Sequence, residues 1–255
     1  MLKRLMSLAM AASALILAPA ACMRAGKSDA ALGPSAADGE IGARPVQAGA
    51  GGKAGQHSLS AGAILYVPPN YDAGRPAPLV VMLHGAGGSA EHSINLGKAH
   101  ADRLGIILMA PQSRASSWDI ISSRRYGADV RTIDRQLQQL FSTYSIDPDH
   151  VAVAGFSDGA SYALSLGLIN GDLFTHVLAF SPGFMAPTKT KGRPPVFISH
   201  GTDDRVLPID VCSRKLVPRL KAGGYVVDYR EFRGGHVVPP ELARWAFDAL
   251  AGSST

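Results

Sequence analysis

The stretch VAVAGFSDGAS, residues 151–161, decides how the chain folds and where its chemistry lies. Its first half is an apolar run typical of a buried strand, and its second half has the composition of a helix. Ser157 therefore stands at a strand-to-helix corner, between Gly155 and Gly159 in the pattern G-x-S-x-G. A serine in this position projects above the sheet at a helix N-terminus, where it can act as a nucleophile. The alternative is that Ser157 only caps the helix.

Strands and helices alternate on both sides of this corner. The expected strands are apolar runs at 63–68, 78–84, 106–111, 150–156, 176–181, 195–200 and 226–232. The expected helices lie at 129–144, 159–169, near 210–222 and near 240–251. Apolar strands separated by helices predict an α/β fold, with a mostly parallel central sheet that helices cover on both faces. Ligands bind such sheets at the carboxyl ends of the strands.

A glycine-rich loop, LHGAGG at 83–88, follows the expected strand at 78–84. Such a loop can turn a backbone N–H toward a serine at a neighbouring strand end. Paired with the N–H of Asp158, it would hold the oxyanion that forms when the serine attacks a carbonyl group. We favour Ala86 as the donor in this loop, with Gly87 as the second choice. A phosphate-binding loop is the rival interpretation, but the spacing G-x-x-x-x-G-K-[ST] is not met.

Two later strand ends supply an acid and a base. HGTDDRVLP at 200–208 holds two neighbouring carboxylates, and the loop pattern favours Asp204 over Asp203 as the group that orients an imidazolium. FRGGHVVPP at 232–240 follows the last expected strand, and His236 lies there behind two glycines. No pair of the other histidines has metal-ligand spacing with a third ligand nearby, so we expect no metal and no other cofactor.

The order of serine, aspartate and histidine along the chain is that of α/β-hydrolases. With LHGAGG, GFSDGAS, HGTDDRVLP and GGH, the chain resembles small bacterial esterases of this superfamily over residues 60–250. The nearest group contains polyhydroxybutyrate depolymerase-like, feruloyl-esterase-like and phospholipase/carboxylesterase proteins. The resemblance implies an α/β-hydrolase fold and hydrolysis of carboxylic esters through an acyl-enzyme. It implies a nucleophile at Ser157, a base at His236, an acid at Asp204, and oxyanion donors at Ala86 and Asp158.

Two aromatic residues are candidates for contact with the substrate. Trp118 follows the expected strand at 106–111, where its indole could pack against an acyl or aromatic group or could cover the edge of the core. Phe184 follows the expected strand at 176–181 and could line the same pocket or only fill space. The connection after Phe184 is short, so we expect little or no lid and an open cleft for small or medium esters.

Other functions stay open at this point. One is a non-catalytic surface lipoprotein that uses the hydrolase fold for binding, although the triad shows no degradation. Another is a peptidase or an acyltransferase that uses the same triad. Nucleic-acid binding is not expected, because the net charge of +5 arises largely before residue 58 and no basic stripe is interleaved with aromatic residues.

The N-terminus has the pattern of an export signal. Lys3 and Arg4 precede an apolar stretch, and small residues precede Cys22. The stretch is shorter than the ~20 apolar residues of a spanning helix. APAAC at 18–22 is similar to the lipobox of bacterial lipoproteins, so Cys22 could be lipidated and attach the protein to a membrane. Plain secretion is the alternative.

These observations divide the chain into three parts. Residues 1–21 are the expected signal peptide, and 22–57 are an expected flexible linker, because Ala, Gly and Ser dominate this segment without an apolar period. Residues 58–255 are the expected catalytic domain. We therefore expect an exported enzyme, periplasmic, anchored to a membrane or secreted, that acts on a small-molecule ester.

Overall fold

A computed structural model describes residues 34–46 and 51–252 of the chain. The expected signal peptide at 1–21 and the expected lipidation site at Cys22 lie outside the described residues. Within the described residues, no helix is both long enough and apolar enough to cross a membrane.

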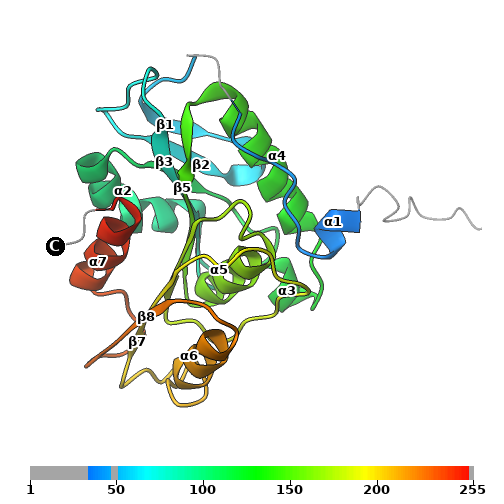
Figure 1. Cartoon of the computed structure of the whole chain (residues 1–255), viewed down its shortest axis with the longest axis vertical. Coiled ribbons are helices and arrows are strands. Elements are labelled where there is room, and N and C mark those ends of the chain that lie inside the picture. Colours follow the sequence, from blue (N-terminus) through cyan, green and yellow to red (C-terminus); the bar gives the residue numbers. More distant parts are fainter. Residues whose placement is uncertain (1–33, 47–50, 253–255) are drawn as a thin grey trace, which may run out of the picture. The chain divides into compact units, whose positions relative to one another are not determined.

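The described strands form one eight-stranded sheet (Figure 1) with the order β1-β2-β4-β3-β5-β6-β7-β8. The strands are β1 (Gly55–Ser58), β2 (Ile64–Val67), β3 (Ala77–Leu83), β4 (Ile107–Ala110), β5 (Ile146–Phe156), β6 (His176–Phe180), β7 (Val196–Gly201) and β8 (Val227–Phe232). The strands from β4 to β8 in this order pair in parallel, and β1 and β2 add an antiparallel edge. The predicted mostly parallel sheet is confirmed.

Helices cover both faces of the sheet (Figure 1). One face carries α2 (Ala90–Leu104) and α7 (Pro240–Leu250). The other face carries α3 (Asp119–Ser122), α4 (Ala128–Thr143), α5 (Asp158–Ile169) and α6 (Ser213–Ala222). Two short elements, α1 (Pro34–Ala37) and the 3-10 turn η2 (Ser60–Gly62), complete the list of described helices.

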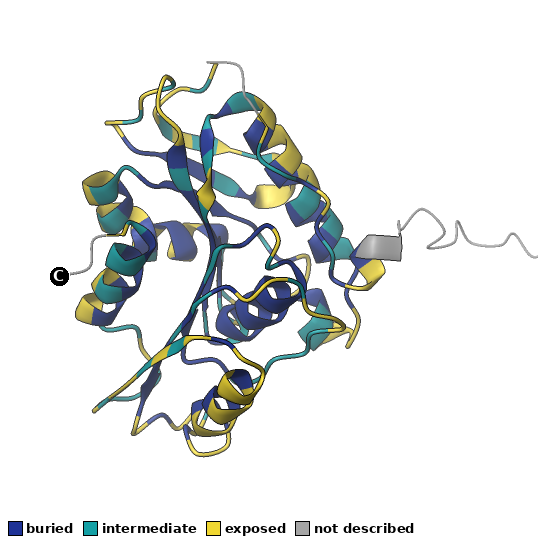
Figure 2. Ribbon diagram, viewed as in Figure 1, coloured by how far each residue is buried: buried dark blue, intermediate teal, exposed yellow. Residues whose placement is uncertain are grey.

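Each face of the sheet has its own hydrophobic core, because successive side chains of a strand point to opposite faces. In β3, Leu79, Val81 and Leu83 belong to the core under α4 and α5, whereas Val80 and Met82 belong to the core under α2 and α7. Figure 2 shows that burial is deepest in the central strands and in α5, which lies between the sheet and the surrounding loops.

The strand register places the ends of five strands side by side, β3, β5, β6, β7 and β8. Leu83 of β3 pairs with Gly155 of β5, and Phe180 of β6 pairs with Ser199 of β7. Gly201 of β7 pairs with the last residue of β8. The loops that follow these strands therefore meet at one edge of the sheet, where ligands bind α/β proteins.

The structure differs from the expected linker at residues 34–46, which we call the N-terminal strap. Ile41 of the strap is 2% exposed. The amide side chain of Asn170, at the end of α5, accepts the N–H of Ile41 at 2.8 Å and donates to the carbonyl oxygen of Gly39 at 2.9 Å. Asp134 on α4 accepts the N–H groups of Gly42 and Ala43 at 2.9 and 2.7 Å. The strap is part of the folded domain, although its composition resembles that of a solvated tether.

The first prediction tests this attachment. Ile41→Ala should lower the free energy of unfolding by about 2–4 kcal/mol, because it removes a buried side chain and leaves a cavity. Val46→Ala is the matched control, since Val46 ends the same strap and is 58% exposed; its effect should stay within about 0.5 kcal/mol. Urea denaturation of both variants measures the difference. Equal stability of the two variants would show that the strap does not pack on the domain.

Candidate active site

Ser157 lies at a sharp corner between β5 and α5. Its backbone has φ 58° and ψ −121°, a conformation that costs energy for a residue other than glycine. The corner is tightly packed: a Cβ atom at Gly159 would lie 2.1 Å from the carbonyl oxygen of Leu83, and one at Gly155 would lie 2.3 Å from the backbone of Gly159. Both glycines are therefore required for β5 and α5 to approach β3 as they do.

The structure brings Ser157, His236 and Asp204 together, although they are far apart in the sequence. The Nε2 atom of His236 lies 2.8 Å from Oγ of Ser157, and its Nδ1 atom lies 2.6 Å from Oδ2 of Asp204. A carboxylate only accepts hydrogen bonds, so Nδ1 donates and Nε2 is left to accept the hydroxyl proton of the serine. The ring of His236 packs against Phe156, with 4.7 Å between the ring centroids.

The carboxyl group of Asp204 is fully buried. Its Oδ1 atom accepts the N–H groups of Val206 and Leu207, each at 2.9 Å. Burial acts to raise the pKa of Asp204, but the hydrogen bonds from His236 and from these two N–H groups outweigh it and hold the pKa below its usual value. Asp204 is therefore ionised at neutral pH. Asp203, the alternative acid, is exposed, and its backbone N–H donates to Gly234 at 2.9 Å.

Two backbone N–H groups beside the serine are free. The N–H of Gly87 donates to the carbonyl oxygen of Ser116 at 2.6 Å. Among the hydrogen bonds of the described residues, none is donated by the N–H of Ala86 or by that of Asp158. A Cβ atom at Gly85 would lie 3.3 Å from Cβ of Ser157, so the Ala86 turn is close to the serine. Of the two donors predicted in this loop, Ala86 has a free N–H, whereas the N–H of Gly87 is already bonded.

The loop at 113–118 holds both the glycine-rich turn and the serine corner. Ser117 donates its hydroxyl to the carboxylate of Asp158 at 2.5 Å. The N–H of Ser113 donates to Nε2 of His84 at 3.1 Å, so the buried His84 ring donates from Nδ1 to the carbonyl oxygen of Gly85 at 2.7 Å. From the sequence, His84 is expected to be a strand-end residue that braces a loop, and its contacts with Gly85 and Ser113 agree with that expectation. Sequence reasoning missed the contact of Ser117 with Asp158.

The position of Trp118 corrects the expectation that it contacts the substrate. Its side chain is 0% exposed and stacks on Tyr162, with 5.1 Å between ring centroids. The indole N–H donates to the carbonyl oxygen of His84 at 2.9 Å, which is the partner that a buried indole needs. Trp118 therefore covers the core and supports the glycine-rich loop. Phe184 is half-buried and does not line the cavity beside His236, so its contact with a substrate stays a prediction.

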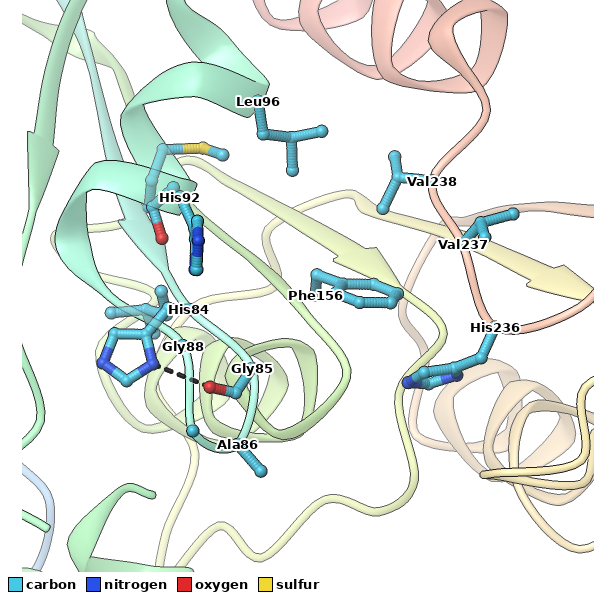
Figure 3. A pocket seen from close by; sticks show the side chains of 14 residues that line it. His84, Gly85, Ala86, Gly88, His92, Leu96, Phe156, His236, Val237 and Val238 are labelled. Carbon is cyan, nitrogen blue, oxygen red and sulfur yellow. Dashed lines mark hydrogen bonds between the residues drawn. The ribbon is translucent and has the colours of Figure 1, made fainter. Parts of the chain in front are cut away.

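A cavity of about 500 Å³ opens beside His236 and Ala86. Figure 3 shows the side chains of Leu96, Phe156 and Val238 converging on it from α2, the end of β5 and the loop before α7. Its walls are mainly apolar, with the ring of His92 across from Phe156. Sequence reasoning missed His92 and Leu96. Their spacing of one helical turn, shortly after the glycine-rich loop, is the signal that could have found them.

The arrangement has the parts of a hydrolase site with a serine nucleophile. A carboxylate, an imidazole and a hydroxyl form one hydrogen-bonded line, two free N–H groups lie beside the hydroxyl, and an apolar cavity opens next to both. Within 34–46 and 51–252, no group of three or more His, Cys, Asp or Glu residues could hold a metal ion.

Comparison with known proteins shows the family of the chain. The chain matches the family model described as "Putative esterase" over residues 60–236, which is more than half of its length. A protein named "Probable feruloyl esterase C" from Aspergillus oryzae is 31% identical over 156 residues, which cover 58% of this chain and 56% of that protein. The "Acetylxylan esterase" of Coprinopsis cinerea is 32% identical over 120 residues, which cover 43% of this chain and 32% of that protein. The chain thus spans about half or less of the length of these curated relatives.

Solved structures show the same fold. Esterase PE8 has a TM-score of 0.60 at 22% identity, and the match covers 78% of this chain and 99% of that one. A ferulic acid esterase from Anaeromyces mucronatus has a TM-score of 0.57 at 18% identity, with 78% and 89% of the two chains covered. The chain belongs to the esterase family whose model it matches, and its fold is that of the α/β-hydrolase superfamily.

Proposed function

We propose that the protein hydrolyses carboxylic esters through an acyl-enzyme on Ser157. The observation that carries the proposal is the hydrogen-bonded line from Asp204 through His236 to Ser157, beside the free N–H groups of Ala86 and Asp158. Family membership supports the same reaction, as do relatives named as feruloyl and acetylxylan esterases.

The geometry suggests how each group acts. Oγ of Ser157 attacks the ester carbonyl carbon while Nε2 of His236 takes the hydroxyl proton. The negative oxygen of the tetrahedral intermediate is held by the N–H groups of Ala86 and Asp158. His236 then gives the proton to the departing alcohol, and Asp204 stabilises the imidazolium in between. Water, deprotonated by His236, attacks the acyl-enzyme and releases the acid.

The cavity beside His236 could hold the apolar part of the ester. Its volume of about 500 Å³ is within the range of small-molecule sites, and its walls are mainly aliphatic and aromatic. A carboxylic ester with an aromatic or branched group on one side of the reacting carbonyl would bury that group against Leu96, Phe156 and Val238.

An ester panel tests the function and the role of the cavity. Purified protein should hydrolyse ethyl acetate, methyl cinnamate and phenyl acetate, which differ in the size of the acyl and alcohol groups. Leu96→Trp narrows the cavity, so it should slow methyl cinnamate or phenyl acetate about tenfold, according to the side of the ester that the cavity receives. This is the effect expected when ~1.4 kcal/mol of transition-state binding is lost. Turnover of ethyl acetate should change by less than about twofold.

The matched control is Asn95→Trp, an exposed neighbour on the same helix, which should leave all three rates unchanged. Equal losses on the three esters in Leu96→Trp would show that the substrate does not use this cavity. Failure of the unaltered protein to hydrolyse any ester in the panel would contradict the proposed function.

We also propose that the protein is exported and that Cys22 is the site of lipidation. The support is the charged start, the apolar stretch and the APAAC pattern at 18–22. Mass spectrometry of the mature N-terminus tests this proposal. An acylated Cys22 supports anchoring, an unmodified terminus after cleavage supports plain secretion, and an intact Met1 contradicts both.

A further inference from the structure

A second histidine, His200, lies behind the acid of the proposed triad and takes no part in the steps above. It is near the end of β7 and its side chain is 0% exposed. Its Nδ1 atom lies 2.7 Å from Oγ of Ser213, the first residue of α6. Its Nε2 atom lies 2.8 Å from the carbonyl oxygen of Leu207 and 3.3 Å from Oδ2 of Asp204. Oδ2 is the same oxygen that accepts the hydrogen bond from His236.

The neighbours of His200 determine where its proton lies. The carbonyl oxygen of Leu207 and the ionised carboxylate of Asp204 can only accept hydrogen bonds, so Nε2 must carry the proton. Nδ1 then has a free lone pair and accepts the hydroxyl proton of Ser213. Burial, the largest influence, lowers the pKa of His200 and keeps the ring neutral at neutral pH. The ring is therefore an uncharged donor whose N–H bonds to the carbonyl oxygen of Leu207 and lies 3.3 Å from Oδ2 of the acid.

We propose that His200 is a positioning residue that holds Oδ2 of Asp204 in place for His236. Oδ1 is already fixed by the two backbone N–H groups of the acid loop. Among the residues that the structure describes, Oδ2 has the two histidines as its partners. Because Nε2 of His200 also holds Leu207, it ties the carboxylate to the loop that carries it. This inference rests on the proposed function, since it assigns a role within the same triad.

His200 also sets how much negative charge the carboxylate presents to His236. A donor that is shared with Oδ2 withdraws part of that charge, and an imidazolium next to a less negative carboxylate is less stabilised. Loss of the His200 donor should therefore leave a more negative carboxylate, which stabilises the imidazolium of His236 more strongly. Since a general base works only when it is unprotonated, the acid limb of kcat/KM would move to higher pH.

Other titratable and charged groups lie near His200 or close in sequence to Asp204 and His236. Glu231 of β8 pairs in register with His200, and Arg214 holds its carboxylate at 2.6 and 2.9 Å. This ion pair is the main cause that keeps the pKa of Glu231 below its usual value, so Glu231 stays ionised through the acid limb. The buried thiol of Cys212, at the start of α6, has its pKa raised by burial and stays protonated there. The charged residues nearest in sequence to Asp204 and His236 are Asp203, Arg205 and Arg233, all of them exposed.

Two amide substitutions distinguish the contacts of Nε2 from the contacts of Nδ1 in the His200 ring. The amide of Gln reaches the position of Nε2, so His200→Gln keeps an N–H donor for Asp204. The shorter amide of Asn lies near Nδ1, so His200→Asn keeps a partner for Ser213 and loses the donor to Asp204. We expect His200→Asn to lower kcat on phenyl acetate about tenfold, with KM within about twofold, because the N–H that faces the buried carboxylate at 3.3 Å is lost. Its acid limb should move to higher pH.

His200→Gln should retain most of the activity and the acid limb of the unaltered enzyme. The matched control is His176→Asn, which changes a half-buried histidine at the opposite end of the neighbouring strand β6 and should leave kcat and the acid limb unchanged. Equal kcat losses in His200→Asn and His200→Gln, or an unmoved acid limb in His200→Asn, would overturn the proposal. Inactivity of the unaltered enzyme would instead count against ester hydrolysis itself.

A measurement on the unaltered protein tests the proposal if the variants do not fold. With ¹⁵N-labelled histidine, NMR at neutral pH should show His200 protonated at Nε2 and unprotonated at Nδ1. A His200 ring protonated at Nδ1 alone could not donate as proposed and would overturn the assignment.

Discussion

Ser157→Ala is expected to lower kcat/KM for phenyl acetate by about 10⁴-fold or more, because it removes the hydroxyl on which the proposed acyl-enzyme forms. The hydroxyl oxygen of Ser157 lies 2.8 Å from Nε2 of His236. Alanine removes the hydroxyl group without adding bulk to the packed corner. The fold should be kept, since the Cβ atom of residue 157 is already accommodated. Steady-state kinetics over a range of ester concentrations measures the loss.

The control for this loss is Ser142→Ala, which changes an exposed serine near the end of α4 and should leave kcat/KM unchanged. A double variant carrying Ser157→Ala and His236→Ala should be no worse than Ser157→Ala alone, because residues that act as one unit are not additive. If Ser157→Ala kept more than about a tenth of the activity, another nucleophile would have to be responsible.

Asp204→Asn is expected to lower kcat/KM by about 10⁴-fold at neutral pH. The amide of asparagine can turn its NH₂ group toward His236, which reverses the hydrogen bond at Nδ1. Nε2 then carries the proton and can no longer take one from the serine. The geometry of the loop should survive, because one amide oxygen can still accept the N–H groups of Val206 and Leu207.

Asp203→Asn is the matched control for the acid. It makes the same chemical change one residue away, on an exposed side chain, and should alter kcat/KM by less than about twofold. The comparison of the two asparagine variants on one ester measures which carboxylate orients the histidine. Losses of the same size in both would leave neither assigned as the acid and would contradict the geometry at Oδ2 of Asp204.

The core strands and the serine corner could be predicted because their signals are local. The apolar run before Ser157 became the buried end of β5, and the run at 78–84 became β3, shifted by one residue. The edge strand β1 gave no such signal, because its sequence GQHS is polar and it pairs on one side only. Helix α2 is also absent from the expected helices, because few of its positions are apolar.

The misjudged parts depend on contacts between residues far apart in the chain. Ile41 is buried because Asn170, 129 residues away, satisfies its backbone N–H, and composition within the strap cannot reveal that partner. Trp118 had two possible roles, contact with the substrate or cover of the core edge, and its indole N–H donates to the carbonyl oxygen of His84 inside the protein, which favours the second. The positions of Asp204 and His236 could be predicted, because their motifs follow strands that the topology places side by side.

Mass spectrometry of the folded protein after reaction with a fluorophosphonate tests the central claim most directly. The hydroxyl of Ser157 should become phosphonylated, so the intact mass should rise by one phosphonyl group and the peptide that contains residue 157 should carry it. Prior heat denaturation should abolish the reaction, because it separates the serine from His236. A folded protein that stays unlabelled, or a label on any other residue, would contradict the account.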